Sequence, residues 1–174
     1  LEFRRVLFRS TMETIKRFQV RGLAGHVERA QLAGRAFDFW APSGGSDHIL
    51  LAHDGQNIFD RRTATFVYTW KLAQAAIRIA EETGKQAPLV IGVFHSSSKE
   101  DPHGRAKDLS PEDAFREGLK PLVQPTVNVN ELRGNAYLST IFDAILPAIA
   151  EKTGSHHLPE QTAMIDRKST RLNS

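Results

Sequence analysis

The residues of this sequence best suited to chemistry are Asp54-Gly55-Gln56-Asn57, a polar string that directly follows an apolar run. The run, His48–His53, is short and largely apolar, as expected for a strand buried in a parallel sheet. In open α/β sheets, ligands bind just beyond the carboxyl ends of the strands. A glycine at that point permits backbone conformations closed to other residues. The amides of this string could therefore point at a developing negative charge.

The segments before this string predict two strands. Gly25–Leu32 and Arg35–Pro42 are joined at Ala33-Gly34, which is too short a connection for a crossover helix, so we expect the pair to be antiparallel. Apolar and polar residues alternate over Ala36–Trp40, which predicts one half-buried face for the second strand.

The segments after the string alternate helices with strands. Thr69–Thr83 has helical periodicity and a stop at Gly84, and Asn135–Lys152 predicts a second, strongly amphipathic helix. Pro88–Phe94 predicts a buried strand, and Gln161–Ile165 predicts the beginning of another strand. The apolar face of the first helix is predicted to be Leu72, Ala75, Ala76, Ile79 and Ala80, and that of the second Leu138, Ile141, Phe142, Ile145, Leu146 and Ile149.

A polar stretch, His95–Arg133, lies between the second strand and the long helix and is interrupted by prolines. It predicts a long loop with a helix near Pro111–Glu117, and a lid over a substrate cleft. Its charged residues are predicted to be solvated, namely Lys99, Asp101, Arg105, Lys107, Asp108, Glu112 and Asp113.

Strands that alternate with helices indicate the α/β class, with a parallel sheet covered by helices. The two closely joined strands add an antiparallel start. We therefore expect the N-terminal half of a larger α/β domain, and the cut sheet should leave an unpaired apolar edge that lowers solubility or leaves the chain partly molten.

The string His-Asp-Gly-Gln-Asn within His53–Asp60 resembles the esterase branch of the α/β-hydrolase fold, which includes esterase D-like, enterochelin-esterase-like and feruloyl-esterase-like proteins. The resemblance covers most of Gly25–Ile165, and this string is its most specific part. The supporting matches are Trp70, Pro88–Phe94, Arg105 to Pro111, Asn135-Ala136-Tyr137 and Ile145-Leu146-Pro147.

This resemblance implies that the backbone of Gly55 or Gln56 supplies one amide of an oxyanion hole, the other coming from the residue after a nucleophile. It implies a small-molecule ester as the substrate and no cofactor. The side chains expected along the cleft are those of His53, Asp54, Asn57 and His95. Two alternatives stay open: Gly55 only makes a turn and Asn57 caps the next segment, or His95 is an ordinary loop residue.

The rest of the esterase machinery is not found in the sequence. No Gly-x-Ser-x-Gly occurs in the 174 residues, and the family's nucleophile follows a strand like Thr162–Ile165, with the acid and the histidine later still. We expect a parent that hydrolyses carboxylic esters through an acyl-enzyme, and no activity from this chain alone. The alternative is a non-catalytic module of this fold that binds carbohydrate or a protein partner. A nucleotide-binding domain is disfavoured, because neither a Walker A string nor Gly-x-Gly-x-x-Gly follows a strand.

Both ends of the sequence predict non-native tails. Codons exist for Leu1–Ser10 and Asp166–Ser174 that make one the reverse complement of the other, and they resemble a short-read sequencing adapter. We interpret residues 1–10 and 166–174 as adapter-derived tails and residues 11–165 as a partial α/β-hydrolase domain, and we exclude the tails from the prediction of the fold.

Without these tails, which hold six basic and two acidic residues, the formal net charge changes from +3 to −1. The basic balance therefore gives no reason to expect a nucleic-acid partner. There is no cysteine. No apolar run is long enough for a membrane span, so no membrane partner is predicted. No calcium-loop spacing occurs around Asp54 and Asp60, for which a structural role is expected, so no metal site is predicted. The cellular compartment and the oligomeric state are not indicated.

Overall fold

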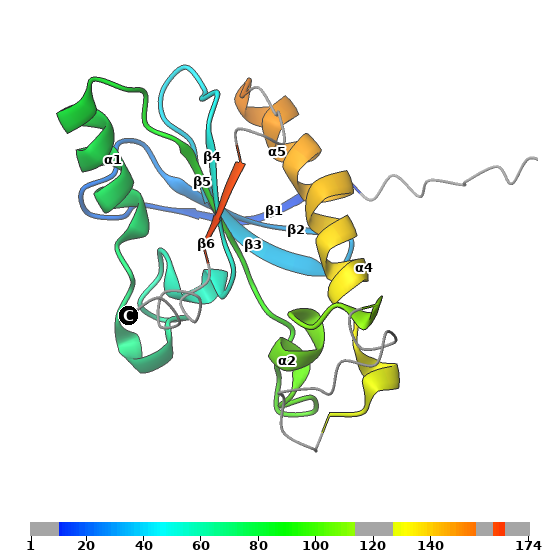
Figure 1. Ribbon diagram of the computed structural model, residues 1–174. Helices are drawn as coiled ribbons and strands as arrows, with labels where there is room; N and C mark the ends of the chain where they lie inside the picture. The colour runs from blue at the N-terminus through cyan, green and yellow to red at the C-terminus, as the bar shows by residue number, and fades with distance from the viewer. Residues whose placement is uncertain (1–10, 114–126, 156–161, 166–174) are drawn as a thin grey trace, which may run out of the picture.

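The computed structural model describes residues 11–113, 127–155 and 162–165, and in them six strands form one mixed sheet (Figure 1). Their order across the sheet is β1 (Glu13–Phe18), β2 (Val27–Leu32), β3 (Arg35–Trp40), β5 (Leu89–Val93), β4 (Ile49–Ala52) and β6 (Thr162–Ile165). The strands β1 to β3 and β5 pair antiparallel, whereas β5, β4 and β6 run parallel. With helices packed against this sheet, the chain belongs to the α/β class. The antiparallel start and the parallel continuation are as predicted.

The predicted hairpin of β2 and β3 is confirmed. Strand β2 (Val27–Leu32) pairs with β3 (Arg35–Trp40) across a two-residue turn in which both Ala33 (φ 49°) and Gly34 (φ 75°) are left-handed. Two positive φ angles define the turn type whose twist matches that of the flanking strands.

The prediction of one half-buried face for β3 is wrong. All four residues from Phe37 to Trp40 are buried, including Asp38, whose side chain is fully enclosed. Asp38 tolerates this position because Arg29 on β2 donates two hydrogen bonds to it, at 2.6 and 2.7 Å. Asp38, the polar residue in the alternating pattern of β3, therefore belongs to a buried ion pair and does not indicate a solvent-exposed face.

Strand β1 (Glu13–Phe18) was not predicted from the sequence. It forms the antiparallel edge of the sheet, and most of its side chains are exposed. Hydrogen bonds from Thr14 and Arg17 to the Glu28 carboxylate, at 2.9 and 2.7 Å, attach it to β2.

The parallel half consists of β4 (Ile49–Ala52), β5 (Leu89–Val93) and β6 (Thr162–Ile165). These strands lie within the predicted ones. The last residue of β4, Ala52, pairs in register with Gly92 of β5 and with Ile165 of β6. The carboxyl ends of all three strands therefore meet at one edge of the sheet.

Helices cover both faces of the sheet, so the molecule has three layers (Figure 1). Alternate residues of β4 and β5 belong to two separate cores: Leu51 and Ile91 pack with the long C-terminal helix, whereas Ala52 and Val90 pack with α1. None of the helices in the described part of the chain has the length and apolar character needed to cross a membrane.

Helix α1 (Leu72–Thr83) begins three residues later than predicted and ends, as expected, at a left-handed Gly84. Its buried residues are Ala73 and Ala80, whereas Ile79, predicted to face the core, is 56% exposed. Ala73 packs in the core with Ala52 and Val90, so this face of the helix is turned toward the sheet.

The long helix contains three continuous segments, α4 (Gly134–Ser139), a π-helical part η4 (Thr140–Ile145) and α5 (Leu146–Thr153). Its predicted stripe is confirmed: Ile141, Ile145, Leu146 and Ile149 are fully buried, and Leu138 and Phe142 pack against them. Within the widened part, the amide of Leu146 donates to the carbonyl of Ile141, five residues earlier.

The polar stretch His95–Arg133 is only partly the predicted loop. It contains α2 (Gly104–Asp108) and a 3-10 turn η3 (Val129–Glu131). Glu112 and Asp113 are helical, within the predicted Pro111–Glu117, and residues 114–117 of that prediction lie outside the described residues. The prediction that its charges are solvated is wrong for Asp108, which has no exposed surface.

Candidate functional site

The polar string after β4 folds into one tight turn at the carboxyl edge of the sheet. Asp54 is left-handed (φ 56°, ψ 41°) and precedes the 3-10 turn η1 (Gly55–Asn57). The first hydrogen bonds of this turn run from the amide of Asn57 to Asp54 O (2.9 Å) and from the amide of Ile58 to Gly55 O (3.1 Å). The amides of Gly55 and Gln56 precede the first of these bonds, so the turn itself does not use them.

Close contact with β5 explains why residue 55 is a glycine. A Cβ atom at Gly55 would lie 2.1 Å from the carbonyl carbon of Gly92 and 2.5 Å from the amide nitrogen of Val93. At Gly92, a Cβ would lie 2.9 Å from the Cα of Gly55. The two glycines therefore let the turn rest directly on the backbone of the neighbouring strand.

An ion pair holds the left-handed Asp54. Arg105 of α2 donates to both carboxylate oxygens, from Nε at 2.6 Å and from Nη2 at 2.7 Å. The Asp54 side chain is 9% exposed and that of Arg105 is 27% exposed, so the prediction of a solvated Arg105 is wrong. This two-bond geometry fixes the orientation as well as the charge of the carboxylate.

His53, the residue before the turn, is buried against the long helix. Its Nδ1 lies 2.8 Å from the hydroxyl oxygen of Tyr137, and the guanidinium of Arg35 lies 4.9 Å from the centre of the Tyr137 ring. Burial raises the pKa of the Tyr137 hydroxyl well above its ordinary value of 10.0. The tyrosine therefore stays neutral and braces His53.

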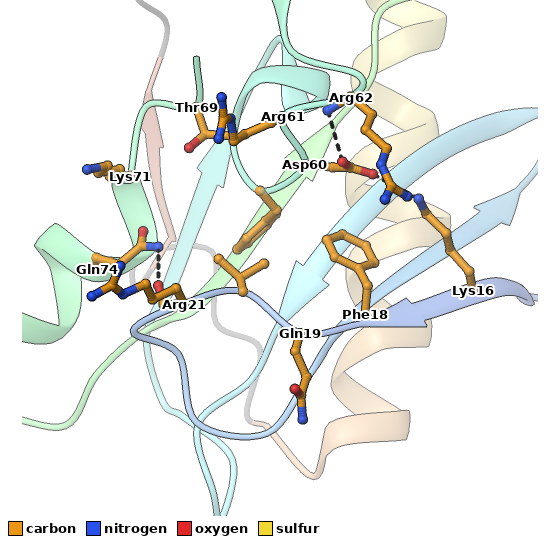
Figure 2. A pocket seen from close by; sticks show the side chains of 12 residues that line it. Lys16, Phe18, Gln19, Arg21, Asp60, Arg61, Arg62, Thr69, Lys71 and Gln74 are labelled. Carbon is orange, nitrogen blue, oxygen red and sulfur yellow. Dashed lines mark hydrogen bonds and ion pairs between the residues drawn. The ribbon is translucent and has the colours of Figure 1, made fainter. Parts of the chain in front are cut away.

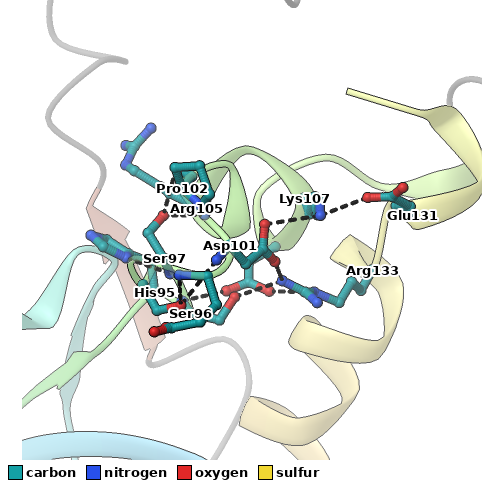
Figure 3. Close-up of polar contacts among 12 residues, drawn as sticks. His95, Ser96, Ser97, Asp101, Pro102, Arg105, Lys107, Glu131 and Arg133 are labelled. Carbon is teal, nitrogen blue, oxygen red and sulfur yellow. Dashed lines mark hydrogen bonds and ion pairs between the residues drawn. The ribbon is translucent and has the colours of Figure 1, made fainter. Parts of the chain in front are cut away.

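His95 follows β5 and lies beside the Asp54–Arg105 pair, close to the turn. Its Nδ1 accepts a hydrogen bond of 3.1 Å from the amide of Ser97 (Figure 3). Burial lowers the pKa of His95 below its ordinary value of 6.5, with Asp54 opposing and Arg105 adding to this shift. A neutral imidazole therefore lies next to the turn at neutral pH.

Gln56 and Asn57 make the contacts that shape the following loop. Asn57 Oδ1 accepts from the amide of Thr65 (2.7 Å), and its carbonyl accepts from the amide of Trp70 (2.9 Å). The carbonyl of Gln56 accepts from Thr63 Oγ1 (2.9 Å). Among the described residues, the side-chain oxygen Oε1 of Gln56 is buried and has no hydrogen-bond partner.

A second buried carboxylate, Asp108, ties the polar stretch to the end of β5. It accepts from Arg35 (2.6 Å), from Arg133 (3.0 Å) and from the amide of Ser96 (2.8 Å). Burial alone would raise the pKa of Asp108, but the hydrogen bonds from Arg35 and Ser96 lower it below 3.8. Arg133 also bonds Ser96 and Asp101, which Figure 3 shows in one group.

The site has little enclosed volume in the part of the chain that the structure describes. A cavity of about 80 Å³ lies beside His53 and Tyr137, well below the volume of a typical small-molecule site. In the described ranges no group of three or more histidine, aspartate or glutamate side chains is placed to hold a metal ion. Asp54 and Asp60 are each paired with a cation instead, Arg105 and Lys16.

The structure thus places four of the six expected site residues, Asp54 to Asn57, in one turn, with His53 directly before it and His95 beside it. It adds three residues that were not predicted as site residues: Gly92, Arg105 and Tyr137. A lone glycine inside an apolar strand is a known sign of close backbone approach, so Gly92 could have been found. The sequence carries no comparable signal for the contacts of Arg105 or Tyr137.

Comparisons with known proteins do not establish a family for this chain. No protein-family model matches this sequence. A search of curated proteins finds no significant match. Among solved structures, the crystal structure of BES protein from Bacillus cereus is similar, with a TM-score of 0.48 and 12% identity over 94% of this chain and 53% of that one. The chain therefore spans about half the length of that structure.

Proposed function

We propose that this chain is part of a serine ester hydrolase with the α/β-hydrolase fold, and that it supplies the oxyanion turn of the active site. The observation that carries the proposal is the turn at Gly55 and Gln56. Its first two amides are not used by the turn, and it lies at the carboxyl ends of the parallel strands of the sheet. Backbone amides held in place before the reaction are the usual means of stabilising the oxyanion in acyl transfer.

The position of β6 supports the same proposal. Ile165 pairs with Ala52, and the carbonyl of Ile165 accepts a 3.1 Å hydrogen bond from the amide of His53. The carboxyl end of β6 therefore lies next to the turn. In α/β hydrolases the nucleophile follows such a strand, and we propose that the full-length protein carries its nucleophilic serine after β6.

In this proposal the residues of the chain position the turn and do not transfer protons. The amide of Gln56 or Gly55 donates to the carbonyl oxygen as negative charge develops on it. Tyr137 and Arg105 hold His53 and Asp54, the two residues that follow β4. The Gly55–Gly92 contact fixes the height of the turn above the sheet. A small-molecule ester would bind above this edge.

The experiment is a pair of substitutions at Gln56 in the product of the intact gene, assayed on a chromogenic acetate ester. Gln56→Pro deletes the amide hydrogen and should lower kcat on the order of a hundredfold, with little change in KM. Gln56→Ala keeps the amide and is the matched control, expected to retain nearly full activity. Circular dichroism would establish that both variants fold.

An unchanged kcat in Gln56→Pro would show that the amide of Gln56 does not stabilise the oxyanion. A gene product without ester turnover, and without labelling by a serine-directed inhibitor, would overturn the esterase proposal and favour the non-catalytic binding module. The 174-residue chain by itself should show no turnover, because the nucleophile is not in it.

A further inference from the structure

A larger hollow lies away from the turn, where the end of β1, the loop after Phe59 and the start of α1 meet (Figure 2). Its volume is about 470 Å³, which is within the range of small-molecule sites. None of its lining residues belongs to the turn or to its contacts with Arg105, Tyr137 and His95. It is therefore a separate site on the molecule.

The lining of this pocket is strongly basic. Five of its side chains are cationic and one, Asp60, is acidic; the cations are Lys16, Arg21, Arg61, Arg62 and Lys71. The residues between the two predicted tails have a formal net charge of −1, so the excess of positive charge is local. A concave surface lined with one sign of charge concentrates ligands of the opposite sign.

The single carboxylate does not cancel this excess. Asp60 accepts a 2.8 Å hydrogen bond from Lys16 and another, 3.0 Å long, from the amide of Arg62. Burial alone would raise the pKa of Asp60, but these bonds lower it, so Asp60 stays charged and paired with Lys16. Arg21, Arg61, Arg62 and Lys71 are left with no further carboxylate in the pocket lining.

The floor of the pocket is apolar. Phe59 is 5% exposed and belongs to the core beneath α1, against which Phe18 and Val20 also pack. Figure 2 shows the aromatic ring of Phe18 within a group of basic side chains. A ligand for such a pocket needs an anionic group for the rim and an apolar group for the floor.

We propose that this pocket binds a small organic phosphate, with the phosphate between Arg21, Arg61 and Lys71 and the apolar part of the ligand on Phe18 and Phe59. A doubly charged phosphate suits several cations better than a single carboxylate does, and arginine binds phosphate oxygens through two parallel hydrogen bonds. The proposal does not depend on ester hydrolysis.

The test uses phenyl phosphate as the probe, titrated by calorimetry into the 174-residue chain and into the product of the intact gene. Saturable one-to-one binding is expected, weakened by added NaCl because the charges are exposed. Inorganic phosphate should bind about tenfold more weakly, because it lacks the apolar group, and benzyl alcohol should not bind measurably.

Two variants locate the site. Arg61→Gln combined with Lys71→Gln should weaken phenyl phosphate binding at least about tenfold, and both residues are exposed, so the fold should be unaffected. Arg78→Gln is the control. Arg78 is an exposed arginine on α1, the helix that borders the pocket, but it lies outside the pocket and is paired with Glu82. Absence of saturable binding to either protein, or equal binding by the double variant and the control, would overturn the proposal.

Discussion

Two neighbouring regions of this molecule use the same unfavourable backbone conformation with very different support. In the turn after β4, Asp54 is left-handed (φ 56°) and buried. In the loop Thr65–Lys71, three residues are left-handed, namely Phe66 (64°), Val67 (61°) and Lys71 (52°). Their side chains are exposed, that of Phe66 to 81% and that of Val67 to 56%.

The difference lies in what holds each strained residue. Asp54 is fixed by two hydrogen bonds from Arg105 and by the contact of Gly55 with Gly92. The loop is held by hydrogen bonds from the amides of Thr65 and Trp70 to Asn57 (2.7 and 2.9 Å), from Val67 N to Ala64 O (3.1 Å) and from Arg61 Nε to Val67 O (3.3 Å). None of these bonds involves the side chain of a left-handed residue, and those side chains are exposed. Strain persists where surrounding contacts overdetermine it. The turn is therefore preorganised, whereas the loop is the region more easily rearranged.

The largest loss of stability is expected from a substitution that separates the turn from the backbone of β5. Gly55→Ala should destabilise the protein by about 3 kcal/mol or more, because the new Cβ meets backbone atoms that cannot move aside. Gly25→Ala is the control: Gly25 is left-handed (φ 72°) but nothing lies within 4 Å of its Cβ position, so the cost should be about 1 kcal/mol. Equal losses in urea unfolding would contradict the close packing of the turn.

A smaller effect is expected from removing the ion pair. Arg105→Ala leaves the Asp54 carboxylate largely buried without this partner and should cost about 2 kcal/mol in free energy of unfolding. Arg78→Ala removes an exposed pair with Glu82 and should cost less than about 0.5 kcal/mol. A loss at Arg105 no greater than at Arg78 would mean that the ion pair does not hold the turn.

In the loop Thr65–Lys71, replacing a left-handed residue should raise the stability of the protein instead of lowering it. Val67→Gly relieves a branched side chain at positive φ and should stabilise the protein by about 0.5 kcal/mol after the entropy cost of glycine. Val129→Gly, in the 3-10 turn η3 where φ is not positive, should destabilise it by about 0.5–1 kcal/mol. Thermal unfolding of the two variants measures this contrast, and stability losses of equal size would show that the loop is not strained.

The smallest effect concerns pH. The folded-state pKa of His95 is lowered by burial, so the unfolded chain binds a proton at a higher pH than the folded chain does. His95 therefore contributes its full stability above about pH 6.5, and this contribution is lost as the pH falls through the folded-state pKa. The Tm of the wild type should fall more than that of His95→Gln on acidification from about pH 7 to about pH 5. Parallel falls in Tm would place His95 in solvent.

Local patterns predicted the elements of this fold well. The turn residues Ala33-Gly34 predicted the hairpin, and the apolar runs Ile49–Ala52 and Leu89–Val93 predicted the strands whose ends carry the site. The stripe of the long helix was also predicted, because an uninterrupted apolar repeat leaves one possible buried face.

Features that depend on distant parts of the chain were not predicted. Arg105 and Asp108 are in a polar stretch that looks solvated, and only the fold shows that they meet Asp54 and Arg35. Strand β1 has mainly exposed and charged residues, so the pairing with β2, and not an apolar pattern, defines it. The Gly55 turn was predicted from its own residues, whereas the contacts that hold it were not.

The pairing of β6 with β4 has a consequence for the order in which the molecule assembles. Ile49 faces Thr162 in this pairing, so about 110 residues are synthesised after β4 before its second neighbour exists. At about 5–20 residues per second, one edge of a buried strand stays open on the ribosome for on the order of ten seconds. During that interval, the open edge of β4 in the nascent chain must be shielded from other growing chains by something other than β6.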